Sequence, residues 1–152
     1  DIPELAFYGC EKIERINIEG DVEKISTNAF RNCTSLIKVG LPKTLKEIES
    51  KAFMNCTNLE NITLPNSIKR IEDYTFANCK SLSMFVISET LEYISENAFQ
   101  NCINLKKFTV HRDNVCFFEE DNNLYIVNGE QELLYIIQAE EYKDELDVDP
   151  SI

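Results

Sequence analysis

The most constraining feature of this sequence is a column of cysteines at a constant spacing. The same step of 23 separates each from the one before, and the column consists of Cys10, Cys33, Cys56, Cys79 and Cys102. Neither a disulfide framework nor a metal site produces such equal steps. Fixed self-similarity at a period of a few tens of residues is the signature of a solenoid, in which each small unit buries its apolar face only by stacking on its neighbours. The chain is therefore predicted to fold as a stack of coils.

Other apolar positions recur at the same step, the clearest being Phe7, Phe30, Phe53, Phe76 and Phe99. The pattern within a unit is Ala-Phe-x-x-Cys-x-x-Leu-x-x-h-x-h, where h is apolar; Ile13 replaces the leucine in the first unit and Thr75 the alanine in the fourth. The alternating end of this pattern predicts a short strand that pairs in parallel with its equivalent in the next coil. The Ala-Phe-x-x-Cys segment is predicted to form a tight helical turn, and a second extended segment, such as Leu45–Ile48, to return along the opposite wall.

These motifs resemble those of a known repeat class. The segment Ala29–Leu36 and its echoes, together with Leu41–Ile48 and Leu64–Ile71, are similar to the BspA-like (treponemal-type) leucine-rich repeats, and the match covers residues 2–111 in register. The resemblance implies a leucine-rich-repeat solenoid of 23-residue coils. It also implies a non-catalytic protein-binding scaffold, within a secreted or cell-surface adhesin whose protein ligand is a host or matrix protein. An intracellular or assembly scaffold is the alternative.

The register divides the chain. Residues 1–111 are predicted to hold five regular repeats, 112–145 an irregular insertion with a β-hairpin, and 146–152 the start of a further repeat, all within one solenoid segment, 1–152. Both ends fall inside a repeat, so we expect a piece of a larger repeat protein; an end sealed by another chain is the competing explanation.

The hairpin is predicted from Asn128-Gly129, which lies between the apolar runs Leu124–Val127 and Leu133–Ile137, because both turn residues tolerate positive φ. The repeat family often has an Asp-Gly-x-Leu-Tyr motif in such a hairpin. Here Asn122 replaces the glycine, and asparagine also tolerates the left-handed conformation.

The charge of the chain excludes some partners. With 15 basic and 27 acidic residues, its formal net charge is −12, which argues against nucleic-acid binding and against association with anionic lipid. No apolar run reaches the length of a membrane span, so no direct membrane insertion is expected in this segment. The ladder cysteines are predicted to be buried, reduced thiols, since side chains in such a column point the same way and five cannot all pair.

The sequence contains no catalytic, metal or cofactor-binding motif. His111 is the only histidine, and it is predicted to be a surface residue without partners at ligand spacing. Three sequons begin at Asn32, Asn55 and Asn61. The first two belong to an asparagine column that also contains Asn78 and Asn101, so we expect these side chains to bond the backbone of a turn. Glycosylation is the alternative.

The outward strand positions form the regular face that solenoids use for binding. By alternation we predict that the partner-binding residues are Arg15, Asn17, Lys38, Asn61, Thr63, Met84, Val86, Lys107 and Thr109, with Gly40 at the remaining outward position. Met84 and Val86 are apolar and expected to be exposed, so they are candidate anchors for a partner. Single exposed apolar residues are also ordinary on protein surfaces, which is the alternative for this pair.

Overall fold

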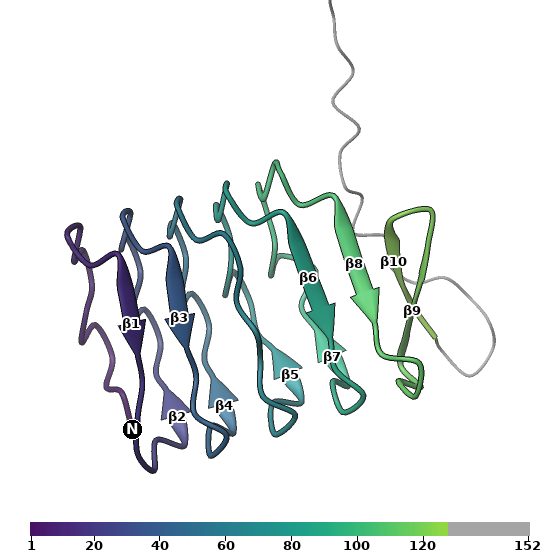
Figure 1. Ribbon diagram of the computed structural model, residues 1–152, viewed down its shortest axis with the longest axis horizontal. Helices are drawn as coiled ribbons and strands as arrows, with labels where there is room; N and C mark the ends of the chain where they lie inside the picture. Colours follow the sequence, from purple (N-terminus) through teal and green to yellow (C-terminus); the bar gives the residue numbers. More distant parts are fainter. Residues whose placement is uncertain (128–152) are drawn as a thin grey trace, which may run out of the picture.

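In the computed structural model, which describes residues 1–127, the chain winds into a row of coils stacked along one axis (Figure 1). One wall of the stack, here called the strand wall, contains β1 (Arg15–Asn17), β3 (Lys38–Gly40), β6 (Met84–Ile87) and β8 (Lys107–Val110). The opposite wall, here called the return wall, contains β2 (Lys24–Ile25), β4 (Glu47–Ile48), β5 (Arg70–Ile71) and β7 (Tyr93–Ile94). The hairpin β9 (Phe117–Glu120) and β10 (Asn123–Ile126) follows the last coil.

Strands pair in parallel with their equivalents one coil away, as predicted. On the strand wall β1 pairs with β3 and β6 with β8, and on the return wall β2 pairs with β4 and β5 with β7. The paired residues are one repeat step apart in the sequence, for example Ile16 and Val39. This register keeps every apolar column on the inside of the stack, because a slip by a single position would turn the alternating side chains outward.

Both ladders are interrupted within the described residues. On the strand wall, Asn61 forms only an isolated bridge to Lys38 and is not paired with β6, and on the return wall β4 is not paired with β5. The turns are linked without such a break, by bonds such as Phe30 N to Ala52 O (2.8 Å) and Phe53 N to Thr75 O (2.9 Å). The turns therefore hold neighbouring coils together where the strands do not.

The interior consists of stacked columns. Neighbouring rings of Phe7, Phe30, Phe53 and Phe76 are nearly parallel, with centroids 4.9, 5.2 and 5.7 Å apart. Beyond Phe76 the stack is joined by Phe85 and Phe108, which meet Phe99 edge-on. Offset stacks and edge contacts are both favourable aromatic geometries. The core changes its packing mode where phenylalanine replaces aliphatic residues on the strand wall.

The Ala-Phe-x-x-Cys segments form the predicted tight turns, but none of the described residues is helical. The bonds span three residues, as from Ala29 N to Ser26 O and from Cys33 N to Phe30 O, both 3.2 Å. Asn28 and Asn32 have φ values of 58° and 63°, which a right-handed helix does not allow. Two left-handed residues four positions apart thus bend the chain at this corner in the first four coils, and Asn101 alone is left-handed in the fifth. No helical segment of residues 1–127 has the length and apolarity needed to cross a bilayer.

The described hairpin is β9–β10, an antiparallel pair. Its turn residues Asp121 and Asn122 have φ values of 50° and 63°, as a type I′ turn requires. Asn122 thus adopts the left-handed conformation that it was expected to tolerate, and the predicted apolar run Leu124–Val127 overlaps β10. The Asn128-Gly129 turn, its second arm and the resumed repeat at 146–152 lie outside the described residues.

Candidate protein-binding face

The outward side chains of the strand wall, together with residues 61–63, form a surface that we call the strand face. Eight of the nine predicted residues are exposed, while Thr109 and also Gly40 are half-buried. Asn61 and Thr63 occupy a segment without a regular strand, so their placement follows the coil rather than a ladder. The alternation of inward and outward residues is confirmed; their binding role stays a prediction.

The strand face has two columns. The register aligns Arg15 with Lys38, Lys38 with Asn61, and Met84 with Lys107 in the first column. In the second column Asn17 lies opposite Gly40, and its side-chain oxygen occupies the space that a Cβ at position 40 would need. The side-chain nitrogen of Asn17 donates to Glu19 at 2.9 Å. Glycine at position 40 therefore makes room for the Asn17 amide.

The cations of the return wall are neutralised by neighbouring acids. Lys46 Nζ lies 2.6 Å from Glu23, Lys69 Nζ 2.8 Å from Glu92, and Lys24 Nζ 2.5 Å from Glu49. The hydrogen bond to Glu92 raises the pKa of Lys69, and the bond from Lys24 lowers the pKa of Glu49. Arg70 bonds Glu72 at 2.9 Å, and its guanidinium lies 4.0 Å from the centre of the Tyr93 ring.

The cations of the strand wall have no such partners in the part of the chain that the structure describes. Within residues 1–127, no carboxylate lies within 4.0 Å of the side-chain nitrogens of Arg15, Lys38, Lys106 or Lys107. Among the described residues these charges are therefore not neutralised, although the chain as a whole is strongly acidic. This contrast distinguishes the strand face from the return wall.

An apolar pair and a hollow lie on the same face. Met84 and Val86 are 43% and 47% exposed, and their register partners are Lys107 and Thr109. A cavity of about 580 Å³ opens beside Met84, where the ladder between Asn61 and β6 is missing, and Glu60, Asn61 and Lys106 are among its lining residues. The break in the ladder thus gives the strand face a polar depression beside an apolar side chain.

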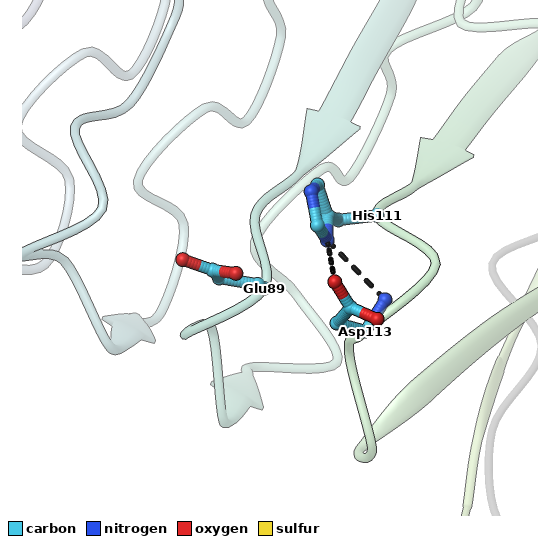
Figure 2. A group of neighbouring side chains, drawn as sticks. All are labelled: Glu89, His111 and Asp113. Atoms are coloured by element: carbon cyan, nitrogen blue, oxygen red, sulfur yellow. Dashed lines mark hydrogen bonds and ion pairs between the residues drawn. The ribbon is translucent and has the colours of Figure 1, made fainter.

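His111 is exposed, as predicted, but the expectation that it lacks partners is wrong. Glu89 follows β6, and His111 and Asp113 follow β8 (Figure 2). One potential ligand atom from each of the three side chains lies within 4.8 Å of the other two. Glu89 was missed because it is distant in sequence. The repeat register could have indicated that Glu89 lies near His111. The position one repeat after Glu89 is Arg112, which lies between His111 and Asp113.

The cysteine column is structural. All six cysteines are free, and the thiols of Cys33, Cys56, Cys79 and Cys102 each donate to a phenylalanine carbonyl of the preceding coil at 3.0 to 3.3 Å. Burial raises the pKa of Cys33 to about 11 and that of Cys102 to about 12, and it raises the pKa of Cys56 and Cys79 as well. A thiolate is the nucleophilic form, so these thiols are poorly reactive. Their predicted burial is confirmed for Cys33, Cys56 and Cys79, while Cys10 and Cys102 are only partly buried.

The asparagine column is structural for a reason that differs from the expected one. Asn55 donates to Asn32 and Asn78 donates to Asn55, each at 2.7 Å, and Asn101 donates to Asn78 at 3.1 Å. The side chains thus bond one another rather than the backbone. All four residues have φ between 57° and 63°, a region that asparagine tolerates. The sequon nitrogens of Asn32 and Asn55 are engaged, since Asn32 donates to the Tyr8 hydroxyl.

A family model for the BspA type leucine-rich repeat region matches residues 1–124 in six copies. This chain belongs to that family. Comparison with curated proteins found no significant match. Leucine-rich-repeat domains of this type commonly mediate protein–protein contacts, and repeat scaffolds of this kind are generally non-catalytic.

Solved structures of bacterial proteins share the BspA-type fold. The Treponema pallidum leucine-rich repeat protein TpLRR is 34% identical, with a TM-score of 0.67 over 69% of this chain and 49% of its own. A leucine-rich cell surface protein of Faecalibacterium prausnitzii is 26% identical, with a TM-score of 0.62 over 84% of this chain and 40% of its own. The pneumococcal vaccine antigen PcpA, 23% identical with a TM-score of 0.61 over 76% of this chain and 33% of its own, shares the fold. The BspA-type chain therefore spans about half, or less, of each of these proteins.

Proposed function

We propose that this BspA-type chain is a non-catalytic protein-binding segment of a surface-displayed adhesion protein, and that it contacts its partner through the strand face. The single observation that best supports this assignment is the contrast between the two walls. Lys46 and Lys69 on the return wall are paired with acids, whereas Lys38 and Lys107 on the strand wall have no acidic partner within residues 1–127. Cations without internal partners are available for intermolecular contacts and for steering an oppositely charged partner.

The chemistry of the face defines the partner that fits it. Lys38 and Lys107 lie in the column that also contains exposed Met84, so a complementary surface presents carboxylates around an apolar patch. Buried apolar anchors supply most of the affinity of an interface, while charges at its rim supply specificity and association rate. We propose a host or matrix protein as the ligand class.

The location at a cell surface rests on family membership and on the similar protein of F. prausnitzii, which is described as a cell surface protein. The alternative is an intracellular or assembly scaffold that uses the same face. Labelling of intact cells with an antibody against this segment separates the two. Surface labelling supports the adhesin, and labelling that requires permeabilised cells supports the internal scaffold.

Binding to immobilised matrix proteins tests the face itself. We expect Lys38→Glu, Lys107→Glu and Met84→Ser each to weaken binding by about tenfold, which is a loss of roughly 1.4 kcal/mol. Matched controls are Lys80→Glu, which reverses the charge of an exposed lysine outside the two columns, and Ile103→Ser, which removes an apolar side chain that is 54% exposed. These controls are expected to bind as the unaltered chain does.

Circular dichroism of every variant confirms that the coil is intact. Equal binding of the strand-face and control variants would show that the contact lies elsewhere. If a charge reversal lowers the affinity only at low ionic strength, the cation acts by long-range attraction of the partner and not by a contact in the bound complex.

A further inference from the structure

The loops that follow β6 and β8 bring a histidine and two carboxylates together. Glu89 comes from one coil, and His111 and Asp113 come from the next, with one ligand atom of each within 4.8 Å of the others. Figure 2 shows His111 and Asp113 facing each other, with Glu89 on the adjoining loop. We propose that these residues bind a divalent first-row transition metal, which fastens the two coils at this edge.

The two backbones that present these side chains are bonded to each other. His111 N donates to Ile87 O at 2.9 Å, and the side-chain nitrogen of Asn114 donates to Ser88 O at 2.7 Å and to Leu91 O at 3.0 Å. The carbonyls belong to the segment that contains Glu89. The spacing between the ligand residues is therefore fixed by the scaffold, and only side-chain rotations are needed to close the site.

The donor set selects the class of cation. Imidazole nitrogen suits Zn²⁺, Cu²⁺, Ni²⁺ and Fe²⁺, while Ca²⁺ and Mg²⁺ prefer oxygen ligands alone. Zinc ligands lie roughly 2.0 to 2.2 Å from the ion, so the side-chain atoms must move closer together on binding. All three side chains are exposed, which leaves them free to make this adjustment and leaves a further coordination position open to solvent.

Two existing contacts must yield to the cation. Asp113 N donates to His111 Nδ1 at 3.2 Å, so in the neutral ring this nitrogen holds a lone pair, which the metal would take in place of the amide. Arg112 Nε lies 3.7 Å from Asp113 Oδ2, but its side chain is 90% exposed and this surface pair is weak. Both contacts lower the affinity without blocking the site.

Calorimetric titration of the 152-residue protein with Zn²⁺ tests the proposal. We expect one ion per chain and a rise in the midpoint of thermal unfolding, because an ion that binds only the folded state stabilises it. His111→Ala, Glu89→Gln and Asp113→Asn should each weaken binding by at least about tenfold and reduce the thermal shift accordingly. Glu96→Gln, which removes an exposed carboxylate outside the cluster, is the matched control and should bind as the unaltered protein does.

Titration with Co²⁺ distinguishes this site from adventitious binding to cysteine. We expect no thiolate-to-cobalt charge-transfer band, and binding that is unchanged in Cys116→Ser. The proposal is overturned by a lack of saturable Zn²⁺ binding below millimolar concentration. It is also overturned by equal affinity in the His111→Ala variant, or by loss of binding in Cys116→Ser.

Discussion

The thiol of Cys56 donates a hydrogen bond to the carbonyl oxygen of Phe30, one coil earlier, across 3.2 Å. The same carbonyl accepts the backbone amide of Cys33 within its own turn. The Phe30 carbonyl thus accepts one hydrogen bond that closes its own turn and a second that connects this turn to the next coil. Alanine or valine would also fit this buried position by size, but neither has a side-chain donor for the carbonyl. The hydrogen bond therefore explains why cysteine occupies the position.

Substitution of Cys56 tests that relationship. Cys56→Ala removes both the sulfur volume and the donor, and should lower the free energy of unfolding by about 1 to 2 kcal/mol. Cys56→Ser keeps a donor within reach of the Phe30 carbonyl and should cost less. Chemical denaturation of both variants gives the order, and a serine variant less stable than the alanine variant would mean that the thiol acts only as apolar filling.

Thiol burial also predicts a pH dependence. A cysteine in the unfolded chain ionises near pH 9.0, whereas Cys33 and Cys102 in the fold do so at about 11 and about 12. Above about pH 9 the unfolded state therefore loses protons that the folded state retains, and stability falls as the pH rises. Well below pH 9 these thiols are protonated in both states, so they do not make the free energy of unfolding depend on pH.

The matched comparison uses Cys33→Ala, which lacks one of the four thiols whose pKa is raised by burial. Its free energy of unfolding, measured by denaturant titration between pH 8 and 11, should fall less steeply than that of the unaltered chain. Parallel curves would show that the folded and unfolded thiols ionise alike. In native protein at pH 8, a thiol reagent should spare Cys56 and Cys79 until denaturant is added.

Substitutions in the asparagine column can separate the contribution of its side-chain hydrogen bonds from that of its left-handed backbone conformation. Asn55 has φ of 62° and forms side-chain bonds with Asn32 and Asn78. Asn55→Gly keeps the backbone conformation but loses both bonds, and should cost about 2 kcal/mol. Asn55→Ala adds the left-handed penalty of roughly 1 to 2 kcal/mol. Thermal or chemical denaturation measures both, and equal stability of the two variants would remove backbone conformation as the reason for the column.

Lys51 occupies a left-handed position with φ of 60°, equivalent to Asn28 in the preceding coil. Lys51→Asn should therefore raise the free energy of unfolding by about 0.5 to 1 kcal/mol. The lost contact is slight, since Lys51 Nζ lies 6.0 Å from the centre of the Tyr74 ring. Lys43→Asn, at a position without positive φ, is the control and should show no gain; a gain in both variants would point to composition rather than backbone geometry.

The repeat spacing was enough to predict the stack of coils, the inward columns and the outward positions of the strand face. This was possible because a constant repeat length leaves a single register in which Phe30, Cys33 and their equivalents are all buried. The pairing of β9 with β10 was not predicted, because the sequence of β9, Phe-Phe-Glu-Glu, does not alternate between apolar and polar residues.

Which side chains meet across neighbouring coils could not be predicted from the repeat spacing. Whether Lys38 meets a carboxylate depends on side-chain directions in neighbouring coils, and so does the convergence of Glu89 on His111. The missing ladder between Asn61 and β6 and the cavity beside it are likewise decided by how adjacent coils pack. Repeat spacing fixes which residues are neighbours, but local packing fixes which of their atoms touch.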